Sequence, residues 1–242
     1  MVIATSLVTY SIYSLNRVTD IEEDKTNLPE RVDFLARRKN LIIFLSFASY
    51  VIALLIGLHR NTMTLPVFLI PFLIGLIYSI KIKSFRVKDI FAMKNISVSL
   101  SWSLSSSLLP FLFYHNTKMM LMFFLFLFMK VFINTVLFDV RDVEGDEKAG
   151  ARTIPVVIGK ENTKKLLLLM NSILLIWPFL SFKMGFFVMY MPVIFFSIFY
   201  GYWYIIEFCK EKENKYYFDY LVDGEFIILA LLSFLIHFYH FN

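Results

Sequence analysis

Long apolar runs alternate with short polar segments along most of this 242-residue chain. A bilayer core of about 30 Å requires roughly 20 helical residues, with a range near 17–25. Membrane-spanning strands would alternate between apolar and polar residues, whereas these runs are continuous. The pattern therefore predicts membrane-spanning helices over residues 41–58, 65–80, 96–114, 119–138, 166–182, 185–208 and 226–241, the second of them short.

The first apolar segment, residues 1–15, is shorter than an ordinary span. As a helix it extends only about 22 Å. It has neither a basic beginning nor a small-residue cleavage site, so it does not read as a signal peptide. We interpret it as the inner part of a span whose beginning is missing or very short, which brings the predicted total to about eight helices.

The composition agrees with a membrane protein. Apolar residues make up 58% of the chain, and the mean hydropathy is +0.67. Soluble domains contain about 45–50% apolar residues, so this chain has more apolar side chains than one soluble core buries. We predict an all-α, polytopic transmembrane bundle that forms a single domain over residues 1–242.

The predicted segments on one side of the membrane hold 20 of the 24 Lys and Arg residues and all 19 Asp and Glu residues. If the spans alternate in direction, the segments on this side are residues 16–40, 81–95, 139–165 and 207–225. The positive-inside rule makes this side cytoplasmic in a multi-pass protein of the cell membrane. The net charge of +5 then reflects membrane orientation, not nucleic-acid binding. Acids do not set topology, so their segregation suggests a functional face.

The segment NRVTDIEEDKTNLPER follows the first apolar run and places Asn16, Asp20 and Asp24 at steps of four. On a helix this spacing stacks the side chains along one stripe. Carboxylates crowded together repel each other unless a positive group lies between them. Taken alone, the segment fits either a solvated helix end or half of a metal site.

A second acidic segment, FDVRDVEGDEKAGARTIPV, places Asp139, Asp142 and Asp146 on one helix face. Gly145 falls inside the pattern, so a break there would put Asp146 on a loop. Clustered oxygen ligands suit Mg²⁺, which binds a few carboxylates and bridges to substrate phosphates. Two such clusters facing one compartment fit a diphosphate with its metal ions. The basic residues of the segment YSIKIKSFRVKD are suited to the remaining phosphate oxygens.

These motifs together resemble the signatures of the UbiA-type intramembrane prenyltransferases. The first signature is an Asn followed by Asp at +4 and +8 and by an N-x-P-x-R tail, which here are Asn16, Asp20, Asp24, Asn27, Pro29 and Arg31. The second is an aromatic residue followed by D-x-x-D-x-x-x-D and a stretch that ends in T-[IL]-P-V. Between them, Tyr78, Ser79 and Lys81 match a Tyr-Ser-x-Lys element. The three motifs occur in the family's order and cover most of the chain.

The resemblance implies a Mg²⁺-dependent prenyl transfer in one central cavity that opens to the cytoplasmic side. An isoprenyl diphosphate would lose its diphosphate, and a lipophilic acceptor would capture the allylic cation. The acceptor is either an ether lipid of the geranylgeranylglyceryl phosphate type or an aromatic quinone precursor. The implied catalytic residues are Asp20, Asp24, Asp139 and Asp142, and the implied metal ligands are these four with Asp146. The implied substrate-binding residues are Asn16, Arg31, Tyr78, Ser79, Lys81, Arg141 and Lys148.

Two features depart from the family pattern. Arg17 stands where many members have Asp, and the family's first membrane helix, which precedes the first motif, is apparently lacking. Two other functions stay open: a carrier or channel for divalent cations, and a catalytically silent homologue that acts as a partner subunit. The oligomeric state is open as well. Lys130, predicted inside a span, is a candidate functional residue, although snorkelling or pairing with Asn134 explains it equally well.

Overall fold

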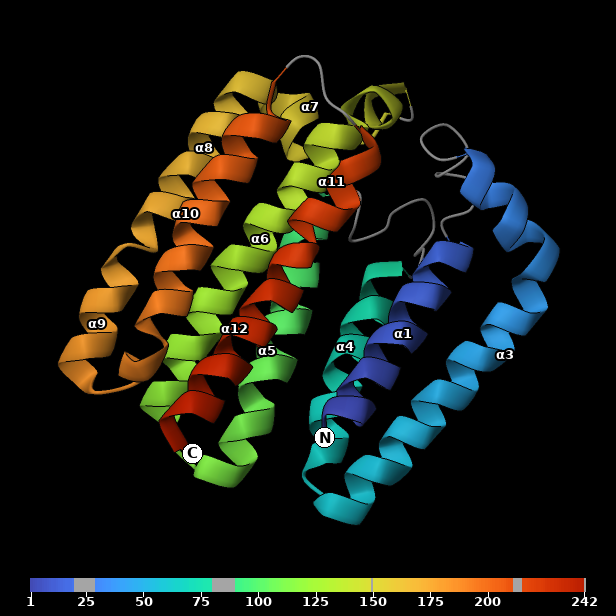
Figure 1. Ribbon diagram of the computed structural model, residues 1–242. Coiled ribbons are helices and arrows are strands. Elements are labelled where there is room, and N and C mark those ends of the chain that lie inside the picture. Colours follow the sequence, from blue (N-terminus) through green and yellow to red (C-terminus); the bar gives the residue numbers. More distant parts are fainter. Residues whose placement is uncertain (20–28, 80–89, 149, 211–214, 242) are drawn as a thin grey trace.

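The computed structural model describes residues 1–19, 29–79, 90–148, 150–210 and 215–241, and this part of the chain is helical without strands (Figure 1). The first half contains α1 (Val2–Thr19), α3 (Pro29–Arg60), α4 (Thr64–Ser79) and α5 (Met93–Tyr114). The second half contains α6 (Thr117–Lys148), α7 (Ile154–Ile158), α8 (Lys160–Ile173), α9 (Ile176–Met184), η2 (Val188–Tyr190), α10 (Met191–Phe208), α11 (Lys215–Val222) and α12 (Gly224–Phe241).

Within the described residues, six helical segments are long and apolar enough to cross a membrane. They are Leu35–Arg60, Met93–Tyr114, Thr117–Lys148, Lys160–Met184, Val188–Phe208 and Tyr220–His240. The apolar part of α4, Thr64–Gly75, is shorter, as predicted. With α1 and α4 the bundle agrees with the predicted total of about eight helices. The prediction of an all-α, multi-pass membrane protein is thus confirmed.

Two helices extend beyond the apolar runs of the sequence. Helix α1 does not end at residue 15 but continues through Asn16 to Thr19, so its 18 residues extend about 27 Å, close to the bilayer core. The Thr19 hydroxyl donates to the Asn16 carbonyl at 2.8 Å inside this polar last turn. Helix α6 continues out of the predicted span, as its acidic spacing indicates, and it runs through a buried Gly145 without a break. At 32 residues it is about 48 Å long, so it projects well beyond a 30 Å core.

The span predicted over residues 166–182 is divided into α8 and α9 at Leu174. Pro178 lies four residues later, so it offers no N–H to the Leu174 carbonyl, and its ring crowds that carbonyl. The ring of Pro178 therefore explains why the helix is interrupted at Leu174. The two pieces still form one continuous apolar segment, Lys160–Met184.

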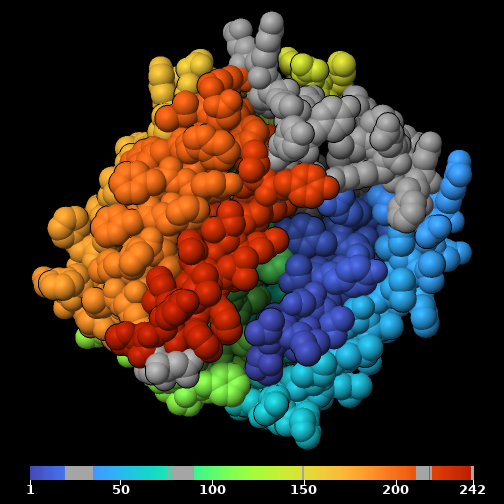
Figure 2. Space-filling view, in the orientation of Figure 1, coloured from blue at the N-terminus to red at the C-terminus, as the bar shows by residue number. Residues whose placement is uncertain are grey.

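Two hydrophobic cores lie on either side of α5. The smaller core joins α1, α3 and α4 through residues such as Ala4, Tyr50 and Phe68. The larger core joins α6 to α11. Figure 1 shows the corresponding two groups of helices, with α5 between them, and Figure 2 shows a furrow on the surface between α12 and α1. The halves thus leave room for a site around α5.

Helix α5 packs closely against α6 through a row of buried serines. The hydroxyls of Ser99, Ser103 and Ser107 donate to the carbonyls four residues earlier, at 2.5–2.6 Å. Small residues of this kind let helix backbones approach in a membrane. The row therefore serves helix packing.

Candidate active site

The second acidic motif lies at one end of α6, and all three of its aspartates are within the helix. This end of α6 and the Thr19 end of α1 are at the same end of the molecule in Figure 1. The structure thus directs both motif helices toward one end of the bundle, as the sequence predicts. Asp20 and Asp24 themselves lie outside the described residues.

Asp139 is the most enclosed of the three aspartates, with an exposed fraction of 0%. Lys94 donates to its Oδ1 at 2.8 Å, and Asn95 donates to its Oδ2 at 2.8 Å. Both donors come from the first turn of α5. The charge of a buried carboxylate is tolerated only with such partners. Asp139 therefore joins α6 to α5 beside the acidic end.

Asp142 is held by the residue that precedes it. The Arg141 guanidinium donates to both Asp142 oxygens, at 2.8 and 2.7 Å, in a bidentate pair. The same guanidinium lies over the rings of Phe138 and Phe218, with its central carbon 4.8 and 5.5 Å from their centroids. The Arg141 side chain thus connects α6, to which it belongs, with α11. Asp142 keeps a side-chain exposure of 20%.

Asp146 has an unsatisfied oxygen. Its Oδ2 atom is buried and has no hydrogen-bond partner among the residues described here. The charges of Lys94, Asp139 and Asp142 all act on this carboxyl group. An orphaned carboxylate oxygen is costly unless a cation or a donor reaches it. The donor set at this end of α6 is therefore suited to a hard cation such as Mg²⁺.

The described part of the chain does not by itself complete a metal site, since no three of its His, Cys, Asp or Glu residues are placed to hold one ion. The oxygens of Asp139 are already engaged by Lys94 and Asn95. The first motif's carboxylates belong to the segment outside the description. Metal binding by Asp20, Asp24, Asp139, Asp142 and Asp146 accordingly stays a prediction.

The other predicted substrate-binding residues are distributed over four helices or lie outside the description. Asn16 is half-buried near the end of α1, and Lys148 is exposed at the end of α6. Arg31 lies near the beginning of α3, and Tyr78 and Ser79 lie at the end of α4, but their side chains are outside the described part. Lys81 lies outside the described residues as well.

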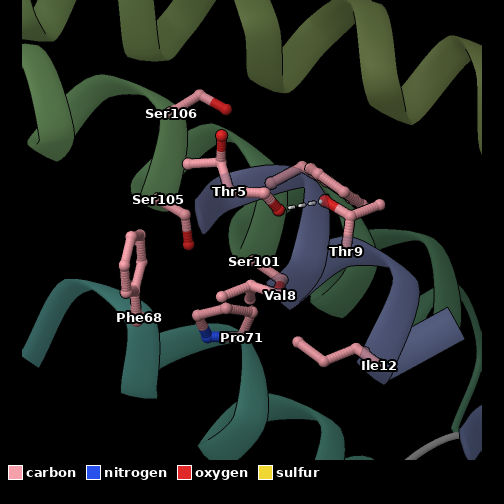
Figure 3. A pocket seen from close by; sticks show the side chains of 10 residues that line it. Thr5, Val8, Thr9, Ile12, Phe68, Pro71, Ser101, Ser105 and Ser106 are labelled. Atoms are coloured by element: carbon pink, nitrogen blue, oxygen red, sulfur yellow. Dashed lines mark hydrogen bonds between the residues drawn. The ribbon is translucent and has the colours of Figure 1, made fainter. Parts of the chain in front are cut away.

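A pocket descends from Asn16 between α1, α4 and α5. Its upper part is lined by Asn16, Tyr13 and Trp102 among others, and its lower part reaches Thr5 and Ser105. The two parts are adjacent, since both are lined by Ile12, Pro71, Ser101 and Trp102. Figure 3 shows the lower part, where side chains of all three helices converge. The lining is largely apolar with a few hydroxyls.

An ion pair that the sequence did not predict lies inside the second half of the bundle. Lys130 Nζ is 2.7 Å from Glu225 Oε1, and both side chains have an exposed fraction of 0%. Lys130 also donates to the Ser197 carbonyl and the Tyr204 hydroxyl at 3.0 Å. Asn134 instead donates to the Val222 carbonyl at 3.2 Å.

This pair corrects two sequence-based interpretations. Lys130 neither snorkels nor pairs with Asn134, because Glu225 lies beside it. Glu225, in turn, is not one of the acids at the aqueous face: α12 begins at Gly224 and already carries Glu225 inside the bundle. A lone Glu at the start of an apolar run, opposite a lone Lys within another, was the available signal.

Comparison with known proteins adds three findings. The model of the UbiA prenyltransferase family matches residues 1–222 of the chain. Two curated relatives, digeranylgeranylglyceryl phosphate synthases from Pyrococcus horikoshii and Pyrococcus abyssi, are each 38% identical over 56 residues, which make up 23% of this chain and 20% of each relative. The matched region thus spans about a fifth of the length of these relatives.

The fold also matches a solved structure, that of a UbiA homolog from Archaeoglobus fulgidus bound to GPP and Mg²⁺. The TM-score is 0.67, and the match covers 98% of this chain and 88% of the other. The sequence identity is 19%, so this likeness concerns the fold.

Proposed function

Since the chain belongs to the UbiA prenyltransferase family, we propose that it transfers a prenyl group from an isoprenyl diphosphate to a lipophilic acceptor and releases diphosphate. The observation that carries this proposal is the acidic end of α6, which lies beside Lys94 and Asn95 of α5, the helix that also lines the pocket. A charged head and an apolar tail on one substrate require this combination of a polar end and an apolar recess.

We assign Asp20, Asp24, Asp139, Asp142 and Asp146 to a Mg²⁺ site at this end. Bound Mg²⁺ supplies charge stabilisation to the departing diphosphate. Asp146 supports the assignment because its buried Oδ2 lacks a partner in the described part of the chain. Asp139 has no exposed oxygen in this arrangement, and Lys94 and Asn95 engage its Oδ1 and Oδ2 atoms, so a metal reaches it only if one of these donors shifts.

The remaining predicted residues bind or orient the substrate in this scheme. Arg141 holds Asp142 in one orientation through its bidentate pair. Asn16 stands at the top of the pocket, where the diphosphate would meet the prenyl chain. We assign Arg31, Tyr78, Ser79, Lys81 and Lys148 to contacts with the diphosphate, which places its recognition on the side of the membrane that we predict to be cytoplasmic.

The reaction exchanges one C–O bond for another if the acceptor is an alcohol. The bond between prenyl C1 and the diphosphate oxygen breaks, and its electron pair leaves with the diphosphate. The acceptor oxygen bonds to C1 and releases its proton to solvent. Tyr13 and Trp102, whose ring centroids are 5.7 Å apart in the pocket, present aromatic faces that attract a developing allylic cation.

An acceptor of the geranylgeranylglyceryl phosphate type is favoured over an aromatic quinone precursor because both curated relatives are named digeranylgeranylglyceryl phosphate synthases. The test is incubation of the purified chain with labelled geranylgeranyl diphosphate, Mg²⁺ and each acceptor in turn. We expect a labelled ether product that disappears in excess EDTA and returns with added Mg²⁺. Transfer that persists in EDTA would remove the metal assignment. No transfer to any acceptor would favour a silent partner subunit or a cation carrier.

A further inference from the structure

Arg17 is the residue at which the first motif departs from the family pattern, since many members have Asp there. A guanidinium at this position replaces a negative charge by a positive one, and its planar fork of donors matches the oxygens of a phosphate. Arg17 is exposed in the last turn of α1. It therefore places a cation at the end of the bundle toward which both motif helices are directed (Figure 1).

The ion pairs of Arg17 differ from those of the other cations near the site. Lys94 is paired with Asp139 at 2.8 Å. Arg141 is paired with Asp142 at 2.7 Å. Arg17 forms no ion pair or side-chain hydrogen bond with any residue that the structure describes. A cation to which the fold gives no carboxylate is suited to an anion that a ligand brings.

Arg17 lies on the face of α1 that borders α12. It follows Tyr13 by four residues, so the two side chains share one helix face. The charges of Arg17 and of Asp223, the residue before α12, both act on the Tyr13 hydroxyl. Tyr13 is 45% exposed, and it lines the upper pocket with Asn16. Arg17 thus lies where the top of the pocket meets the furrow between α1 and α12 (Figure 2).

The acceptor favoured above carries a phosphate of its own, which requires a cation apart from the metal site. A lipid phosphate stays in the headgroup region, at the ends of the membrane-spanning helices. Arg17 is two residues from the end of α1 and therefore lies at this depth. The acceptor phosphate also approaches the diphosphate and the aspartates, and these like charges repel each other unless a cation lies between them.

We propose that Arg17 binds the phosphate of a phosphorylated lipid acceptor and selects this acceptor over one without a phosphate. The inference rests on the proposed function, because it assigns recognition of the acceptor's headgroup in the same reaction. It leaves the metal ligands and the diphosphate contacts as assigned above.

The test compares two acceptors, geranylgeranylglyceryl phosphate and geranylgeranylglycerol, which differ in whether the glycerol carries a phosphate. The purified full chain in detergent receives labelled geranylgeranyl diphosphate and Mg²⁺, and kcat/KM is measured for each acceptor. Wild type should prefer the phosphorylated acceptor. Arg17→Gln should lower kcat/KM for this acceptor about tenfold or more, the usual range for losing charge-assisted hydrogen bonds. It should leave kcat/KM for geranylgeranylglycerol and the KM for geranylgeranyl diphosphate unchanged.

Two further variants separate recognition from structure. Arg17→Lys keeps the charge but loses the planar fork, so it should recover part of the preference. Arg60→Gln is the matched control, since Arg60 is an exposed arginine at the far end of α3 and its loss should leave both acceptors at the wild-type kcat/KM. The helix dipole also favours a cation in the last turn of α1. Melting temperatures of the variants therefore distinguish a weaker helix from weaker recognition.

Three results overturn the inference. Equal kcat/KM of wild type for the two acceptors does so without any variant, which keeps the test decisive if Arg17→Gln does not fold. An unchanged preference in Arg17→Gln shows that Arg17 does not contact the acceptor phosphate. A raised KM for geranylgeranyl diphosphate assigns Arg17 to the diphosphate instead. If wild type transfers the label to no acceptor, the proposed function fails together with this inference, whereas transfer to an aromatic acceptor alone refutes the inference and leaves prenyl transfer standing.

Discussion

Removing one partner of the Lys130–Glu225 pair should destabilise the fold far more than removing both. Lys130→Met deletes the ammonium that lies 2.7 Å from Glu225 Oε1. The carboxylate would then keep the Ser197 hydroxyl, which donates to Oε1 at 2.7 Å, and the neighbouring Tyr204 hydroxyl, but no opposite charge among the residues described. The Ser197 carbonyl and the Tyr204 hydroxyl would also lose the Lys130 donor.

The expected magnitude follows from the complete burial of both side chains. Breaking a buried pair by removing one partner costs about 3–5 kcal/mol, because the other charge stays buried without compensation. In Lys130→Met/Glu225→Leu no charge is left, and the remaining cost is that of polar groups without partners. We therefore expect the double variant to lie within about 2 kcal/mol of wild type.

The assay is reversible unfolding in mixed micelles with increasing SDS, followed by tryptophan fluorescence. Lys183→Met, at an exposed lysine at the end of α9, is the matched control and should unfold as wild type does. The reasoning is refuted if Lys130→Met unfolds at the wild-type midpoint. It is also refuted if the double variant loses as much stability as the two single variants together, since that excludes coupling between the two residues.

Two further predictions use the same bundle and its site. Gly201→Ala should cost about 1–3 kcal/mol, because its Cβ would lie 2.5 Å from Asn171 Oδ1 and 3.1 Å from Lys130 Nζ. Gly75→Ala is the control, since apart from the backbone of its own helix no described atom lies within 4 Å of its Cβ. Equal stability of the two variants would contradict the prediction. Asp142→Asn should lower kcat at least ~10²-fold because it removes charge that organises the leaving group. Glu144→Gln, at an exposed neighbour, is the control and should keep the wild-type kcat. Near-normal turnover of the Asp142 variant would show that the site is misplaced.

The fold follows from the sequence because the bilayer imposes a length on each apolar run. The seven runs became helices or parts of helices at the predicted places. Helix ends were less predictable, because a helix that leaves the membrane keeps its own hydrogen bonds. For this reason α1 extends through Asn16, and α6 passes Gly145 without a break.

Residues of the candidate site could be recognised in the sequence where they form a periodic motif and not where they pair across the bundle. The spacing of Asp139, Asp142 and Asp146 along one helix makes them recognisable in the sequence. Lys94 and Asn95 belong to no such pattern, and their place beside Asp139 depends on how α5 packs against α6. A lysine and an asparagine at the start of an apolar helix, on the side that holds the acids, were the only hint in the sequence.

The serine row on α5 has a mechanical consequence for the pocket on the helix's other face. Because Ser99, Ser103 and Ser107 direct their hydroxyls to their own helix, the side-chain hydrogen bonds that join α5 to α6, among the residues described, are those at Asp139. Below that point, small side chains and apolar surfaces set the register between the two helices. Rotation of α5 about its anchored end breaks no cross-helix hydrogen bond there. The α5 wall of the pocket is therefore anchored at the end where the diphosphate would bind, and no cross-helix hydrogen bond among the described residues holds the part that a prenyl chain would contact.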